Sequence, residues 1–366
     1  MAISTIGTNS LSDPIAVNGY TPTASNMQPF NRIINGAMTI DQRNAGASVT
    51  ATSHPYTLDR WRAVISQAAK FTVQQNAAAI TPPVGFTNYL GVTSSSAYSI
   101  TSSDYFFLRQ SIEGFNTADL AWGTASAATI TLSFRVYSSL TGTFGGALQN
   151  NSQNRSYPFS YSIPTANTWT TISVTIAGDT TGTWETGSNS GMLVVFGLGV
   201  GTSLSGTAGA WVGAIAQSAT GATSVVGTSG ATFYITGVQL EAGSTASPFA
   251  HEFVGDTLLK CQRYYQLAEG FNGIAAGSGT KMYCTLQFKT EMRANPSVSA
   301  NANIQITYPG VNDYTQSSPS VTLAAGRVST RAIQVNLNNF TGLTNLSPLA
   351  HNVGVNNASI TLSSEL

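Results

Sequence analysis

The ionisable side chains that could perform acid, base or metal chemistry are few in this sequence and stand apart from one another. The acids that could form a catalytic pair occur singly, at Asp104, Glu113, Asp119, Asp179 and Glu185. A glycosidase needs two carboxylates across a sugar cleft, and no spacing here recommends such a pair. The three histidines, His54, His251 and His351, are remote in sequence and show no HxH or HExxH spacing. The sequence therefore predicts no catalytic residue, no metal site and no enzyme.

Cofactor and calcium patterns are equally weak. The glycine-rich run Gly197-Leu-Gly-Val-Gly201 lacks the lysine of the GxxxxGK[ST] phosphate loop, so no cofactor is predicted. Calcium needs about six to eight oxygen ligands, and no acidic cluster such as DxDxD occurs. Three roles stay open for Glu241, just after an apolar strand: capping a turn, pairing with Arg32 or Arg62, or helping to hold calcium. Pairing is the role that we expect.

Binding of a neutral sugar is the chemistry that the residue types favour. Sugars are held by aromatic rings under their apolar faces and by neutral hydrogen-bonding groups around their hydroxyls, and this chain is rich in both. The candidate platforms lie outside the predicted buried alternation: Trp122, Tyr157, Tyr161, Trp184 and Trp211. Aromatic residues also fill sandwich cores and subunit interfaces, so for each residue alone a structural role is the alternative. As a group they predict one or two exposed rings.

The charge balance excludes several classes of partner. Only 8% of residues are charged, against about a quarter in an average protein, and the stretch between Glu185 and Glu241 has no charge at all. Lys+Arg and Asp+Glu both number 15, which gives no attraction for nucleic acid or for an anionic membrane. Near-zero net charge also favours association, so we expect a homo-oligomer.

Other sequence features concern the compartment and the membrane. The start, MAISTIGTNSLSDP, has neither a basic region nor an apolar core, which predicts synthesis in the cytoplasm. The weakly polar run from Gly191 to Ala216 holds seven glycines, so we interpret it as two buried strands joined by a loop and expect no membrane insertion. Cys261 and Cys284 are predicted to be buried thiols.

Alternating apolar and polar residues predict β-strands. Ile130, Leu132, Phe134 and Val136 alternate with Thr129, Thr131, Ser133 and Arg135. The segment Trp169 to Ile176 repeats this pattern, with Ile172, Val174 and Ile176 inward. From Phe233 to Leu240 the apolar phase slips at Gly237, which predicts a β-bulge.

Three regions follow along the chain. Residues 1–30 are rich in Ser, Thr and Asn and predict an extended arm. Residues 31–255 hold enough strands for a jelly-roll β-sandwich. In residues 256–366 we expect a helix capped by Asp256, with Leu258, Cys261 and Tyr265 on one face, and then a smaller β domain. The predicted fold class is therefore all-β: a jelly roll, a short helix and a second, smaller β domain.

Several short strings stand out along the chain: Asn31-Arg-Ile-Ile-Asn-Gly-Ala-Met38 with Gln42-Arg43, Tyr56-Thr-Leu-Asp-Arg-Trp61, Val238-Gln-Leu-Glu-Ala-Gly243 with Pro248-Phe249, Cys261-Gln-Arg-Tyr-Tyr265, Met292-Arg-Ala-Asn-Pro296 and, more weakly, the terminal Ser-Glu-Leu366. Together they resemble a group of bacteriophage and prophage virion proteins, often tail-fibre or receptor-binding components. The resemblance implies a jelly roll similar to a carbohydrate-binding module and a place on the virion. It carries no particular ligand. Within it, Asp59, Arg60 and Trp61 could shape a sugar site, but we expect Trp61 to anchor the core.

Three hypotheses follow from the residues and the resemblance together. The first is a structural virion protein, a tail fibre or host-recognition appendage that binds host surface polysaccharide. Residues 1–30 would then dock onto other virion proteins, and the homo-oligomer would be a trimer, the usual symmetry of fibres. The second is a capsid-decorating cement or head-fibre protein with no sugar ligand, and the third is a polysaccharide depolymerase.

Overall fold

The structure is a computed structural model that describes residues 31–366 apart from 278, 309–311, 317–319, 345–346 and 353–357. The described residues divide into two compact units, the first ending at Glu252 and the second running from Phe253 to Leu366. The predicted arm, residues 1–30, lies outside the described residues. In the described part of the chain, no helix is long and apolar enough to cross a membrane.

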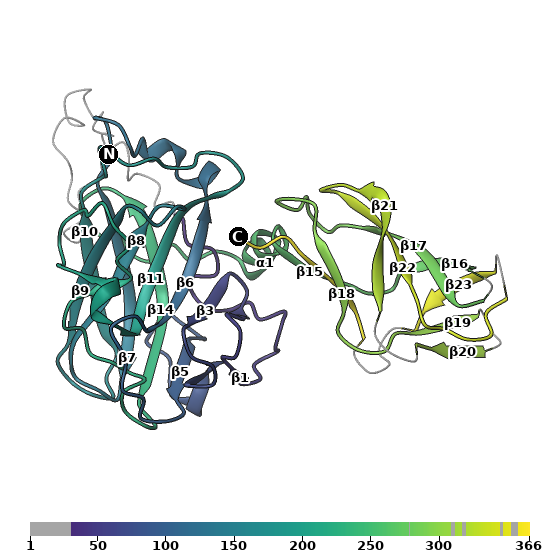
Figure 1. Cartoon of the computed structure of the whole chain (residues 1–366), viewed down its shortest axis with the longest axis horizontal. Helices are drawn as coiled ribbons and strands as arrows, with labels where there is room; N and C mark the ends of the chain where they lie inside the picture. The colour runs from purple at the N-terminus through teal and green to yellow at the C-terminus, as the bar shows by residue number, and fades with distance from the viewer. Residues whose placement is uncertain (1–30, 278, 309–311, 317–319, 345–346, 353–357) are drawn as a thin grey trace, which may run out of the picture. The chain divides into compact units, whose positions relative to one another are not determined.

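The first unit is a jelly-roll sandwich of two six-stranded antiparallel sheets (Figure 1). One sheet has the order β1 (Val49–Thr50), β4 (Phe71–Gln75), β5 (Leu90–Ser94), β14 (Thr232–Ala242), β7 (Ile130–Ser138) and β10 (Thr170–Ile176). The other has the order β2 (Tyr56–Leu58), β3 (Trp61–Ile65), β6 (Tyr105–Glu113), β11 (Ser190–Val200), β8 (Gly142–Gln149) and β9 (Ser156–Ile163). The connections carry the short parallel pair β12 (Ser205–Gly206) and β13 (Ser218–Ala219) and four 3₁₀ turns, η1 (Ala77–Ala79), η2 (Gly114–Asn116), η3 (Ala118–Leu120) and η4 (Thr202–Leu204).

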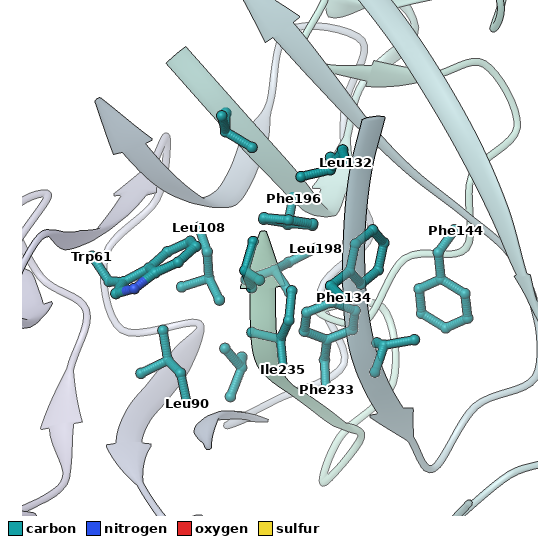
Figure 2. Packing of buried hydrophobic residues seen from close by; sticks show 14 of the residues in the cluster. Trp61, Leu90, Leu108, Leu132, Phe134, Phe144, Phe196, Leu198, Phe233 and Ile235 are labelled. Carbon is teal, nitrogen blue, oxygen red and sulfur yellow. The ribbon is translucent and has the colours of Figure 1, made fainter. Parts of the chain in front are cut away.

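The core of this unit lies between the two sheets, and Figure 2 shows its side chains meeting from both sides. Phe134 of β7 packs edge-on against Phe196 of β11, with ring centroids 5.1 Å apart. The alternation predicted for β7 is confirmed, because Ile130, Leu132, Phe134 and Val136 are all fully buried. Trp61 is also fully buried, and its Nε1 donates to the Asn35 carbonyl oxygen at 3.2 Å, so it anchors the core as expected.

The predicted bulge in β14 is present. Its pairing with β7 shifts between Thr236 and Gln239, and Gly237 has a φ of 60°. At this point Val238 donates its backbone N–H to the Gly36 carbonyl oxygen at 3.0 Å. The bulge therefore frees a backbone group of β14 for the segment that precedes β1, while Phe233 and Val238 both stay in the core.

Two local predictions are wrong. The run from Gly191 to Ala216 forms one long strand, β11, followed by η4 and the two-residue β12, and not two buried strands. The chain turns at Gly201, where an added Cβ would lie 2.2 Å from the Thr101 carbonyl oxygen. The predicted helix, α1 (Val254–Gln262), begins before Asp256, which lies in its first turn and does not cap it, and Tyr265 lies in the following strand.

The second unit joins α1 to two sheets. Three strands have the order β15 (Tyr265–Ala268), β24 (Ile360–Ser363) and β18 (Ser297–Ala300). Seven strands have the order β20 (Asn312–Thr315), β19 (Gln305–Tyr308), β23 (Pro348–His351), β16 (Asn272–Ala276), β17 (Lys281–Gln287), β22 (Ala332–Leu337) and β21 (Val321–Val328). A separate apolar core includes Cys284, Leu286, Val335 and Ile360. Both cysteines are buried thiols, as predicted.

Candidate functional site

Three of the five predicted aromatic residues meet at one end of the sandwich. The ring centroid of Trp122 lies 4.7 Å from that of Trp184 and 5.3 Å from that of Trp211. The Trp184 and Trp211 centroids are 5.6 Å apart, and all three pairs are close to perpendicular. Edge-to-face contacts of this kind are the favoured geometry for aromatic pairs. We call Trp122, Trp184 and Trp211 the tryptophan cluster.

The two predicted tyrosines divide between this cluster and the core. Tyr157 packs edge-on against Trp211, with centroids 5.2 Å apart, and is buried. Tyr161 points between the sheets, where it contacts Phe134 and Phe144. Burial raises the pKa of Tyr161 above its ordinary value. Tyr161 is therefore a core residue and not a sugar platform, because it lies on the inward phase of β9.

Each indole of the cluster is fixed by a hydrogen bond from its Nε1. Trp122 donates to the Ala128 carbonyl oxygen at 2.7 Å, and Trp211 donates to the Ala177 carbonyl oxygen at 2.8 Å. Trp184 donates to Oδ2 of Asp179 at 3.1 Å. With their polar atoms satisfied by the protein, the rings present only apolar surface to a ligand.

Asp179 holds the loop that carries Trp184. It forms a bidentate ion pair with Arg155, in which Nε donates to Oδ2 at 3.0 Å, and it accepts the Gly182 N–H at 3.0 Å. Burial alone would raise the pKa of Asp179, but the hydrogen bonds from Arg155, Trp184 and the Thr181 N–H outweigh it and keep the pKa below its usual range. The carboxylate therefore stays charged and organises this loop.

Gly123 keeps the two loops of the cluster in close contact. Its φ is 86°, and an added Cβ would lie 2.3 Å from the Gly182 carbonyl oxygen. Its backbone N–H donates to the Asp179 carbonyl oxygen at 2.7 Å. A side chain at position 123 would thus separate Trp122 from the Trp184 loop.

A pocket of about 200 Å³ opens beside the tryptophan cluster. We call it the indole pocket; Trp122 and Trp184 line it, together with the buried Met192, and threonines 117, 124 and 186 contribute hydroxyls. Glu185 is the only ionisable side chain among these lining residues, all of which are described. A retaining or inverting glycosidase uses two carboxyl groups, and the described lining of this pocket supplies one.

Two of the remaining single acids have identified structural partners. Asp119 forms an ion pair with Arg32 at 2.7 Å. Burial alone would raise the pKa of Asp104, but hydrogen bonds from Thr101, Ser66 and Tyr98 lower it to about 2. Among the residues that the structure describes, no group of three or more His, Cys, Asp or Glu could hold a metal ion.

The predicted pairing of Glu241 with an arginine is wrong, because Glu241 pairs with neither Arg32 nor Arg62. Its Oε1 accepts the Ser247 N–H at 2.9 Å and its Oε2 accepts the Ser247 hydroxyl at 2.6 Å. Glu241 therefore caps the turn after β14, the first of its three possible roles, because that turn brings the Ser247 donors to it.

A second aromatic cluster was missed in the sequence. Tyr137 and Tyr234 are register partners on the outer face of the first sheet, and their rings stack with centroids 5.3 Å apart and 9° between planes. Tyr89 and Trp169 pack against them. The sequence carries a signal for this cluster, because Tyr137 follows Val136 and so lies on the outward phase of a strand with a predicted buried face. Tyr89 and Tyr234 are buried, while Tyr137 and Trp169 keep part of their surface exposed.

No known protein family matches the sequence, and no curated protein matches it. Among solved structures, 58% of the chain is similar to 21% of the enzymatically active domain of tailspike protein 4 from bacteriophage CBA120, at 11% identity and a TM-score of 0.31. A putative sugar binding protein from Bacteroides thetaiotaomicron matches 58% of this chain over its full length, at 14% identity and a TM-score of 0.33. A family 11 carbohydrate-binding module from Clostridium thermocellum, in complex with a mixed-linked tetrasaccharide, matches 54% of this chain over 97% of its own, at 11% identity and a TM-score of 0.29. The chain thus spans about a fifth of the tailspike chain, and these likenesses concern the fold alone.

The substitution Asp179→Asn tests how far this carboxylate stabilises the first unit. We expect the free energy of unfolding to fall by about 3 kcal/mol at neutral pH, because Arg155 would lose its charged partner. The folded-state pKa is below the unfolded value, so this contribution is complete above about pH 4 and is lost as the pH falls through the folded pKa. The difference in unfolding free energy between the wild type and Asp179→Asn should therefore become smaller as the pH falls.

All five tryptophans precede residue 252, so tryptophan fluorescence during urea unfolding follows the first unit. The exposed Asp313→Asn is the matched control and should change this unfolding by less than about 0.5 kcal/mol. An equal loss at neutral and acid pH for Asp179→Asn would refute the assigned role.

Proposed function

We propose that the protein is a non-catalytic bacteriophage virion component that binds neutral host-surface carbohydrate in the indole pocket. The observation that carries this proposal is the chemistry of the pocket wall, in which two indoles stand beside hydroxyl groups and a single carboxylate. A sugar ring has an apolar C–H face that packs on an indole and a rim of hydroxyls that need hydrogen-bonding partners. Both needs are met here without a cation.

The polar groups of the pocket are placed to meet a sugar rim. The Thr124 hydroxyl donates to the Ala121 carbonyl oxygen at 2.7 Å, and the Thr117 hydroxyl donates to the Gly114 carbonyl oxygen at 3.2 Å. Each hydroxyl oxygen keeps lone-pair capacity for a sugar O–H. The exposed Glu185 adds a charged acceptor, which forms stronger hydrogen bonds than a neutral one.

The size and rigidity of the pocket favour a single sugar residue. A volume of about 200 Å³ is below the roughly 300–1,000 Å³ of sites for drug-sized ligands. The indoles are already held by their hydrogen bonds to Ala128 and Asp179, so little side-chain entropy is lost on binding. A longer glycan would therefore place one ring in the pocket and extend from it.

The virion setting rests on the sequence strings between Asn31 and Pro296, which resemble phage tail-fibre and receptor-binding proteins. In this proposal residues 1–30 attach to other virion proteins and the chain assembles as a homotrimer. Immunogold labelling of the phage particle tests the setting. Label at the tail tip supports host recognition, whereas label spread over the capsid shell would replace it with a cement role.

The substitution Trp184→Ala tests the pocket itself. Removing one wall should weaken binding to neutral oligosaccharides on a glycan array by about 10- to 100-fold, the effect of losing a central aromatic contact. Trp169→Ala is the matched control, because it removes another partly exposed indole of the first unit that lies outside the pocket.

Trp184→Phe keeps an aromatic face and should retain part of the affinity, which separates loss of contact from loss of folding. Equal binding by Trp184→Ala and the wild type, with unchanged unfolding, would reject the pocket as the sugar site. Weaker binding in Trp169→Ala alone would instead assign sugar binding to the outer-face cluster that contains Tyr137 and Trp169.

A further inference from the structure

Two arginines lie directly opposite each other in the first unit, on the sheet that contains β3 and β6. Arg62 of β3 and Arg109 of β6 are register partners in an antiparallel pair. Their strand neighbours Trp61, Ala63 and Leu108 belong to the core, so alternation places both arginines on the outer face. Like charges at directly opposite positions destabilise a sheet. In a chain with only 15 Lys+Arg, this arrangement requires an explanation.

No acid of the described residues forms an ion pair with either arginine. Arg62 donates from Nε to the His54 carbonyl oxygen at 2.9 Å, and its guanidinium lies over the Tyr56 ring, 5.5 Å from the centroid. The Nε of Arg109 is buried and has no hydrogen-bond acceptor among the described residues. The pair therefore keeps donors and positive charge that the protein does not neutralise.

The pKa shifts of the neighbouring groups reflect the positive charge of this pair. Burial, and after it the charge of Arg62, lower the pKa of Arg109 from its ordinary value. Burial, followed by the charges of Arg62 and Arg109, lowers the pKa of His54. A third cation is close, because the guanidinium of Arg43 lies 5.0 Å from the centroid of the same Tyr56 ring.

A purely structural role accounts for only part of the arrangement. Beneath the arginines, Val64, Phe107 and Val195 form a small buried apolar cluster on the outer face. Arginine stems cover apolar surface well, so this cluster explains the long side chains. It does not explain two arginines at directly opposite register positions, since any long neutral side chain would cover the same surface without repulsion.

We propose that Arg62 and Arg109 form an oxyanion-binding site for a carboxylate, phosphate or sulfate group. The guanidinium is a planar fork of N–H donors that matches these groups in two-point contacts. Both side chains keep part of their surface exposed, so an anion in solution reaches them. Neither residue lines the indole pocket, so the site stands independently of the proposed sugar function.

Thermal unfolding of the full chain, followed by tryptophan fluorescence, tests this site with inorganic phosphate as the probe. At a phosphate concentration about five times its Kd, the melting temperature should rise by about 2–4 °C over a chloride control of equal ionic strength. Arg62→Gln should abolish this rise. Arg135→Gln should keep it, because Arg135 lies on the other sheet and faces Thr171 and Thr236, with no arginine opposite.

The variant Arg62→Glu separates binding from folding. It places a carboxylate opposite Arg109, so in chloride it should melt above Arg62→Gln, and phosphate should have no further effect. Equal phosphate shifts in the wild type and Arg62→Gln would overturn the proposal. So would the absence of any shift in the wild type.

The source of the anion is distinguished by comparing glucuronate with glucose at equal concentration. A rise with phosphate and with glucuronate, but not with glucose, assigns the site to acidic sugars, whereas a rise with phosphate and none with glucuronate assigns it to free inorganic anions. If indole-pocket binding fails in Trp184→Ala while the phosphate shift persists, the two sites are separate, as proposed.

Discussion

The packing of two six-stranded sheets across their inward faces is the constraint on which the rest of the first unit depends. Phe134 and Phe196 meet there from opposite sheets, and the strands end where this apolar layer ends. The tryptophan cluster stands at those strand ends, since Ala128 precedes β7 and Ala177 follows β10, and both accept indole N–H groups. Because indoles cover this end of the apolar core, Trp122 and Trp184 form an aromatic wall of the indole pocket.

Because few residues of this chain are charged, the position of a single charged pair has clear consequences for its surroundings. Asp179 and Arg155 neutralise each other and fix the loop of Trp184, so one ion pair links stability to the shape of the pocket. Arg62 and Arg109 are the opposite case, because they are register partners and no acid among the described residues forms an ion pair with them. In the described part of the chain, a surface poor in charge thus contains an aromatic pocket with a single carboxylate and a pair of arginines that forms no ion pair.

Strands that bury one face could be predicted from the sequence, because the alternation in β7 repeats with the period of the pleat. Loops and site residues were less predictable. The sequence predicts Tyr161 as a sugar platform like the tryptophans, although its position on β9 directs its side chain between the two sheets. The Tyr137 and Tyr234 pair was missed because cross-strand register depends on the whole sheet. For Glu241 the sequence predicts an arginine partner, because nothing local shows that its turn supplies two Ser247 donors.

The most direct measurement is a crystal structure of the protein with the neutral oligosaccharide that binds best on a glycan array. The account predicts a sugar ring in the indole pocket, with its apolar face on Trp184 and its hydroxyls toward Glu185 and the threonines. A sugar bound on the Tyr137 and Trp169 face, or an empty indole pocket at saturating ligand, would contradict it.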